Sequence, residues 1–245
     1  MALAILITIT MGCIVWSVWI RRVTWSCRWE VAPTLNIALQ GAAVLLMSPL
    51  AGQTLGVALH SLTGKWNLQA YIGHDCYIVA ASAVVYNALG RLQDDHAMQR
   101  SFKQYVERPA TLCIPLLLVT FSLGNGARIY RADFFEVPTD FWLNMYWLLL
   151  CGTLIYLLVY GSRALLILRK DPRSRMVANL YLAASASGIM ACLVRLITAF
   201  VTPIQALAGG TVVVWFFACM CGAGFAIASA HSWRIKTKWF TKVAR

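Results

Sequence analysis

The feature that most constrains this chain is the recurrence of long apolar runs separated by short basic segments. Seven such runs stand at about 2–20, 33–59, 68–90, 109–126, 141–163, 177–200 and 211–231. A helix needs about 20 predominantly apolar residues to cross the hydrocarbon core of a bilayer. Charged residues make up only 12% of the chain, well below the share usual for a soluble domain. The sequence therefore predicts an all-α, polytopic membrane bundle of about seven transmembrane helices, forming a single domain over 1–245.

The distribution of basic residues predicts the orientation of this bundle. Of the 21 lysines and arginines, 17 fall in the segments 21–30, 91–108 and 163–175 and in the C-terminal tail. The alternate loops hold only Lys65, Arg128 and Arg131. Because cytoplasmic loops carry an excess of positive charge, we expect the N-terminus outside and the C-terminus in the cytoplasm of a plasma (inner) membrane. The same clustering explains the net charge of +12 without a nucleic-acid partner.

Two prolines and one tryptophan lie at informative places in the predicted spans. We expect Pro49 and Pro115 to kink the second and fourth helices. Trp215, near the outer end of the last run, is placed where tryptophans mark the membrane interface. Ala184 and Gly188 are four residues apart, a spacing that lets helix backbones approach closely, and we expect them to pack inside the bundle.

The eight cysteines predict neither a disulfide framework nor a metal site. Nearly all of them lie within apolar runs, where cysteine behaves as a small hydrophobe. Cys219 and Cys221 form a Cys-x-Cys pair, but helical residues two apart point in nearly opposite directions. They should not bind one metal ion together.

Several functional classes lack the residues that they require. A retinal protein needs a lysine inside its last helix, and no predicted span contains one. Among the four histidines, only His60 and His74 are placed to share a haem or metal, and ordinary hydrogen bonding is the favoured interpretation. No Ser-His-Asp order, His-Glu-x-x-His motif or Gly-rich phosphate loop occurs. We therefore expect no enzymatic activity, no cofactor and no bound metal.

The most informative residues are two charges inside predicted spans. Asp75 lies about 12 Å into the third run, at a rise of about 1.5 Å per residue, and Arg195 lies at a similar depth in the sixth. Such charges are costly in a bilayer unless paired or hydrated, so they are candidate functional residues. The favoured interpretation is an intramembrane Asp75–Arg195 ion pair. A small-ligand or ion site is the second, and separate snorkelling of the two side chains is the third.

Other polar side chains extend this candidate site. Tyr71 and Ser82 share a helical face with Asp75, and His74 and His60 lie near the outer ends of neighbouring predicted helices. Together they predict an outer polar site at which the protein senses or anchors something.

Three stretches of the chain resemble a family of actinobacterial multi-pass membrane proteins that are regarded as transporters. These stretches are Leu62-Thr63-Gly64-Lys65-Trp66-Asn67-Leu68 with the following Gly73-His74, the segment from Tyr160 to Arg169, and the sixth run with Gly188 and Leu193-Val194-Arg195-Leu196. The resemblance implies a multi-pass fold and a transport role. Members of that family usually continue into a cytoplasmic domain that this chain lacks, and such a shortened form suggests a phage or mobile element as its source.

Taken together, the sequence predicts a non-catalytic multi-pass plasma-membrane protein that acts by binding a ligand or a partner protein, in a sensor, regulatory or accessory role. Its basic inner face should contact anionic lipid or a membrane or cytoplasmic protein partner. The alternative is a small-solute or ion transporter. That alternative is disfavoured by the lack of an inverted repeat and by the odd number of spans.

Overall fold

The computed structural model of the chain describes residues 2–27, 30–201 and 209–243. Within these ranges the regular structure is entirely helical. The elements are α1 (Ala2–Ile20), η1 (Arg22–Ser26), α2 (Val31–Met47), α3 (Pro49–Gln53), α4 (Leu55–Thr63), α5 (Leu68–Leu89), α6 (Asp95–Phe102), η2 (Lys103–Glu107), α7 (Arg108–Leu123), α8 (Asn125–Arg128), η3 (Phe134–Glu136), α9 (Phe141–Leu168), α10 (Arg175–Phe200) and α12 (Gly209–Val243).

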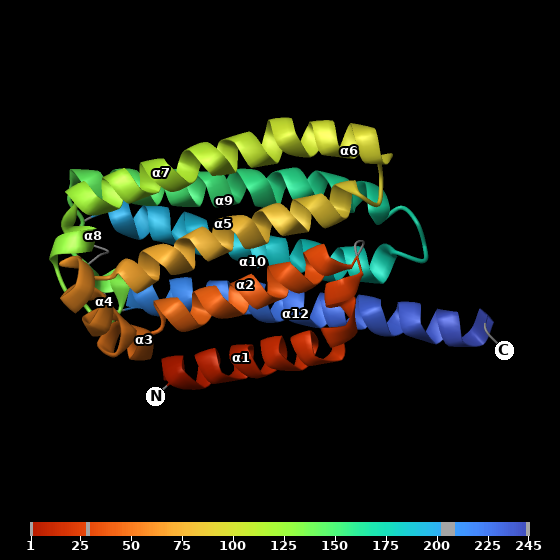
Figure 1. Ribbon diagram of the computed structural model, residues 1–245, viewed down its shortest axis with the longest axis horizontal. Helices are drawn as coiled ribbons and strands as arrows, with labels where there is room; N and C mark the ends of the chain where they lie inside the picture. The colour runs from red at the N-terminus through yellow and green to blue at the C-terminus, as the bar shows by residue number, and fades with distance from the viewer. Residues whose placement is uncertain (1, 28–29, 202–208, 244–245) are drawn as a thin grey trace.

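Five long helices form a closed ring. Around it α2 packs on α5, α5 on α9, α9 on α10, α10 on α12, and α12 returns to α2. Two further helices lie outside the ring, α1 against α2 and α12, and α7 against α5 and α9. Figure 1 shows the long helices running side by side, with the short α3, α4 and α8 gathered at one end. The space enclosed by the ring becomes the candidate site described below.

The composition of the helices makes this a membrane protein. Among the described residues, five helical segments are long and apolar enough to cross a bilayer: α1, the continuous run from α6 to α7, α9, α10 and α12. The flanking helices expose large apolar side chains, such as Ile9 on α1 and Leu112 on α7, which lipid would cover. The other two ring helices differ because α2 is shorter and α5 carries His74 and Asp75. The helices α2, α7 and α9 pack against α5, and the apolar side chains of Ile72 and Val79 remain exposed on it.

The second predicted span is not one kinked helix, so that prediction is wrong. α2 ends at Met47, and Ser48 adopts an extended backbone whose side chain accepts a hydrogen bond from the Ala51 N–H. Pro49 follows at the first position of α3. Proline lacks an N–H and disfavours a helical residue before it, so it starts a new helix here. The chain then runs through α3 and α4 to Gly64, whose positive φ of 71° ends α4.

Other predicted boundaries are too short. The fourth helical run starts at Asp95, capped by the Asp94 carboxylate, and reaches the predicted span through the π-helical turn η2. Pro115 lies inside α7 without ending it. α9 and α12 also continue past their predicted ends at 163 and 231. Basic residues, which are good helix formers, extend α12 and the run from α6 to α7 beyond their apolar parts, whereas α9 continues past Arg163 through the apolar residues 164–168.

The connecting segments divide between two ends of the bundle. One end, here called the η3 end, holds the segments 48–67 and 124–140, which are joined by the Trp66 N–H donating to the Ala127 carbonyl. The other, here called the Arg21 end, holds the segments 21–27, 90–107 and 169–174 and the last turns of α12. The predicted basic clusters lie at the Arg21 end, and Arg28 and Arg245 of those clusters lie outside the described residues.

Small residues bring α10 and α12 together, as predicted. A side chain at Gly188 would lie 2.9 Å from the Cys221 sulfur on α12 and 2.9 Å from a methyl of Leu158 on α9. A Cβ at Gly224 would lie 2.9 Å from the Ala184 Cβ. The small-residue spacing therefore serves close packing within the bundle. All eight cysteines are free, and Cys219 and Cys221 face different neighbours.

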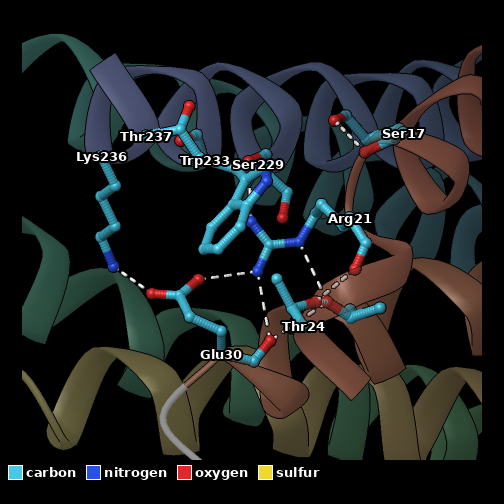
Figure 2. A network of polar contacts seen from close by, with 10 residues as sticks. Ser17, Arg21, Thr24, Glu30, Ser229, Trp233, Lys236 and Thr237 are labelled. Atoms are coloured by element: carbon cyan, nitrogen blue, oxygen red, sulfur yellow. Dashed lines mark hydrogen bonds and ion pairs between the residues drawn. The ribbon is translucent and has the colours of Figure 1, made fainter. Parts of the chain in front are cut away.

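A buried arginine locks the Arg21 end. Arg21 is fully buried, and its guanidinium donates from Nε to the Thr34 hydroxyl, from Nη1 to the Ser229 carbonyl and from Nη2 to Glu30. The Glu30 carboxylate also accepts from Lys236 near the end of α12 (Figure 2). Every guanidinium nitrogen thus has a partner, and the network ties α1, α2 and α12 together. Although burial raises the pKa of Glu30, hydrogen bonds from Lys236 and Arg21 outweigh it and hold the pKa below its usual value.

This network predicts a graded loss of stability. Glu30→Gln should lower the free energy of unfolding by about 3–5 kcal/mol, because it leaves the Arg21 charge buried without a carboxylate. Lys236→Met should lower it by less than about 1 kcal/mol, because Lys236 is 37% exposed and its charge is solvated. Reversible unfolding of the detergent-solubilised protein measures both values.

The exposed Glu107→Gln serves as the control and should leave stability unchanged. Glu30 contributes to the free energy of unfolding at pH values above the ordinary carboxyl pKa. This contribution is lost as the pH falls through the lowered pKa of Glu30 in the folded protein. The difference between wild type and Glu30→Gln should therefore shrink in acid. Equal effects of the Glu30 and Glu107 substitutions at neutral pH would contradict this account.

Candidate functional site

The ring of five helices encloses a cavity of about 90 Å³. Each ring helix contributes a face, and each face follows the spacing of three and four residues that helical geometry imposes. The faces comprise Gln40 and Met47 on α2; His74, Tyr77 and Ala81 on α5; Trp147, Leu150, Cys151, Leu154 and Leu158 on α9; Gly188, Ala191, Cys192 and Arg195 on α10; and Val214, Trp215, Ala218, Cys221 and Phe225 on α12. On α10 the lining face spans about 10 Å along the helix axis, at about 1.5 Å per residue.

Arg195 is the charged residue of this lining. Its side chain is 5% exposed, and Nη1 donates to the Phe135 carbonyl at 3.1 Å. The guanidinium carbon lies 4.0 Å from the centre of the Trp147 ring and 5.5 Å from that of Phe135. Cation–π contacts of this kind contribute about 2 kcal/mol when they are desolvated. The remaining two nitrogens, Nε and Nη2, have no hydrogen-bond partner in the described part of the chain.

The turn η3 covers the cavity at the η3 end. Phe134, Phe135 and Val137 are buried, and Phe135 also lines the cavity. Asp133 holds this turn in place, since its carboxylate accepts from the Phe135 N–H at 2.9 Å and from the Trp215 ring N–H at 2.7 Å. Burial raises the pKa of Asp133, and these two hydrogen bonds offset part of the rise.

An aromatic cluster surrounds the covered end of the cavity. His74 is buried, and its Nδ1 lies 2.7 Å from the Tyr146 hydroxyl. The His74 ring packs edge-on against Trp147, and the Phe135 ring stacks on Trp147 from the η3 turn. These rings fix the position of the Arg195 guanidinium by contact from two sides.

Three further residues of the lining carry a buried polar group without a hydrogen-bond partner among the described residues. These groups are the Trp147 ring N–H, the Tyr77 hydroxyl and the Gln40 side-chain oxygen. A buried polar group without a partner costs about 1–3 kcal/mol. Their convergence with Arg195 on one cavity indicates a binding site, because ligand pockets are mostly apolar with a few polar groups that orient the ligand.

The predicted Asp75–Arg195 ion pair is wrong. The ion pairs of the described residues join Glu30 to Arg21 and to Lys236, and neither charge of the predicted pair takes part. Successive helical residues point about 100° apart, so α5 can direct only one of His74 and Asp75 into the ring. It directs His74 inward, while Asp75 interacts with Tyr71 on its own helix and with Cys113 on α7, outside the ring.

The structure does not assemble the predicted outer polar site either. His60 stacks on Trp66 with ring centres 3.5 Å apart, and it does not line the cavity. The Tyr71 hydroxyl reaches the Ile114 carbonyl of α7, and the Ser82 hydroxyl bonds to its own helix at Ile78. Of the predicted residues, the cavity includes only His74 and Arg195.

Sequence reasoning missed the most important neighbours of Arg195. Phe135 and Asp133 lie in a loop, and only the apolar pair Phe134-Phe135 next to an acidic residue hinted that this loop enters the bundle. Trp215 is 1% exposed and bonded to Asp133, so its ring faces the interior of the bundle rather than lipid headgroups. The sequence places Arg21 among the basic residues of a predicted loop. In the structure it is buried and bonded to Thr34 and Glu30.

Comparisons with protein-family models, with curated proteins and with solved structures find no match to this chain. The resemblance to the actinobacterial family therefore stays a prediction.

Because Asp75 and Arg195 do not contact each other, we expect substitutions at the two positions to affect the free energy of unfolding independently. The effects of Asp75→Asn and Arg195→Met on the free energy of unfolding should add to within about 0.5 kcal/mol in the double variant. Residues without shared partners behave in this way: Asp75 interacts with Tyr71 and with α7, whereas Arg195 contacts Phe135 and Trp147. Chemical unfolding of the wild type, the two single variants and the double variant measures whether the two effects add. A coupling of more than about 1 kcal/mol would show that the two charges interact after all.

Proposed function

We propose that this chain is a multi-pass plasma-membrane protein that crosses the bilayer seven times and acts without catalysis, by binding a small ligand inside its helical ring. The N-terminus and the η3 end face outward, and the Arg21 end faces the cytoplasm. Binding beneath the η3 turn makes the protein a receptor or sensor for a solute that arrives from outside. Its basic cytoplasmic end contacts anionic lipid or a protein partner.

One observation carries this proposal: the contrast between the two buried arginines. Arg21 has a partner at every guanidinium nitrogen, including a carboxylate. Arg195 has one carbonyl and two unpartnered nitrogens. Leaving a buried charge with unused donors is costly, and the contacts of Arg195 with Phe135 and Trp147 do not supply the missing hydrogen-bond partners. Strained and under-satisfied polar groups are expected where binding requires them.

The orientation follows from charge and from the arrangement of the ends. The basic clusters at the Arg21 end favour the cytoplasm by the positive-inside rule. The α2 and α5 helices complete seven crossings if α5 spans the bilayer inside the ring. In that arrangement the polar side chains of α5 face protein rather than lipid.

Site-directed labelling tests the topology. A cysteine placed at Arg131, which is exposed at the η3 end, should react with an impermeant thiol reagent in intact cells. A cysteine at Asp94, at the other end, should react only after the cells are opened. The unsubstituted protein provides the background from its eight native cysteines. The reverse pattern would overturn the orientation, and labelling of both sites in intact cells would mean a miscounted span.

A transporter is the second candidate function, and the broken second helix favours it. α2 ends at Met47, a residue of the cavity lining, and the chain continues as separate short helices. Transporters form midplane sites from discontinuous helices of this kind. Flux of a bound solute into proteoliposomes would favour the transporter, and binding without flux would favour the receptor.

The ligand itself can be sought by co-purification. Wild-type protein extracted gently from its membrane should carry a small molecule that native mass spectrometry detects, and Arg195→Met should lose it. The same substitution should cost at most about 2 kcal/mol of stability, because removing an under-satisfied charge offsets the loss of its cation–π contacts. Arg21→Met is the contrasting control and should destabilise by about 3–5 kcal/mol. A loss of stability at Arg195 as large as that at Arg21 would assign Arg195 a structural role.

A further inference from the structure

The two unpartnered nitrogens of Arg195 lie on one edge of the guanidinium. In arginine the Nε–H and one N–H of Nη2 point in the same direction and form a side-on fork, while Nη1 points away. Arg21 shows the same fork in use, with Nε donating to Thr34 and Nη2 to the Glu30 carboxylate. In Arg195 the bond from Nη1 to Phe135 leaves this edge without a partner among the described residues, and Arg195 is part of the cavity lining. Such a fork matches two oxygens of one planar anion.

The charge balance around the cavity favours an anion. Glu136 of the η3 turn is exposed, and the buried Asp133 just before the turn already accepts with its two oxygens from Phe135 and Trp215. Asp75 faces away from the ring towards α7. Arg195 forms no ion pair with any described carboxylate, although the nearby charge of Asp133 attracts it electrostatically. A ligand carrying one negative charge would add to that attraction and would accept from both unpartnered donors at once.

The rest of the lining restricts what the anion can carry. Most of the remaining lining is apolar and includes Leu150, Leu154, Leu158, Ala191 and Phe225, while Tyr77 and Gln40 are among its polar exceptions. Its volume of about 90 Å³ is smaller than the cavity of about 150 Å³ that accommodates benzene in an engineered protein. A phosphate or a dicarboxylate would bury a second charge against this apolar wall at high cost. The space suits a short aliphatic chain.

We infer that the ring cavity binds a short aliphatic monocarboxylate, with its carboxylate on the Nε–Nη2 edge of Arg195 and its alkyl chain directed along α10 towards Phe225. This inference rests on the proposed function and names the ligand class of that site. The Trp147 ring lies against the guanidinium, and its N–H, which also lacks a partner, is a further donor of this lining. The η3 turn closes the site over the bound head group.

The test uses the full-length protein in detergent with butyrate as the probe, and butyramide as a neutral probe of the same shape. Trp147 and Trp215 line the cavity, so tryptophan fluorescence reports both binding and thermal unfolding. Butyrate should raise the midpoint of unfolding in a saturable manner, because a ligand that binds only the folded state stabilises it. Butyramide, and sodium chloride at equal ionic strength, should not. Octanoate should bind at least about tenfold more weakly than butyrate, because its chain exceeds the cavity.

Two variants connect the response to the site. Arg195→Lys keeps the charge but loses the fork, and it should weaken butyrate binding by about tenfold or more. Ala191→Leu keeps Arg195 and fills the cavity with a side chain, so it should abolish binding in a protein that still folds. The exposed Arg131→Lys is the matched control and should bind as wild type does.

The outcomes separate this inference from the proposed function. Equal binding of butyrate and butyramide, unchanged by Arg195→Lys but lost in Ala191→Leu, would overturn the carboxylate assignment and leave a ligand-binding cavity. Butyrate binding that survives Ala191→Leu would place it outside the ring and overturn the inference. If neither probe binds while a co-purified molecule depends on Arg195, the ligand class is wrong and the function stands. If no co-purified molecule is found either, both fail.

Discussion

The energetics of this protein are governed by the cost of burying a guanidinium in an apolar helical bundle. Removing such a charge from water costs several kcal/mol even after the protein relaxes, so its donors must find partners. At the Arg21 end the chain meets this requirement fully, with Thr34, Glu30 and Ser229 around one side chain. The result is a connection between α1, α2 and the long helix α12. Arg195 is buried to nearly the same extent without equivalent partners, and this difference gives the two ends different roles.

The five-helix ring explains how an under-satisfied charge can be tolerated. Contacts between α10 and α12 are close because Gly188 and Gly224 allow their backbones to approach, and the Arg21 network anchors α12 to α2. These contacts stabilise the fold at places that do not require Arg195. The cavity can then retain four unpartnered polar side chains, because the stability that they cost is supplied elsewhere in the bundle.

The sequence predicted the helical architecture well and the site only in part. Apolar runs and basic clusters are properties of whole segments, so they identify the long helices and their alternating direction without knowledge of packing. The choice between His74 and Asp75 depends on the rotation of α5 about its axis, and one residue of sequence corresponds to about 100° of rotation. Hydropathy does not determine that angle, because both residues interrupt the apolar run equally. The partner of Arg195 could therefore not be identified from depth alone.

The loop between α8 and α9 was beyond sequence reasoning for a different reason. Its entry into the bundle depends on contacts between residues far apart in the sequence. Asp133 bonds to Trp215, and the backbone of Ala132 lies directly against Gly52. A Cβ at Gly52 would be 2.4 Å from the Ala132 carbonyl oxygen. Neither contact leaves a local pattern in the chain. Both hold the Phe135 carbonyl where it accepts from Nη1 of Arg195, and that single bond determines which edge of the guanidinium faces the cavity. The specificity of the proposed site thus depends on a loop residue whose side chain carries no charge.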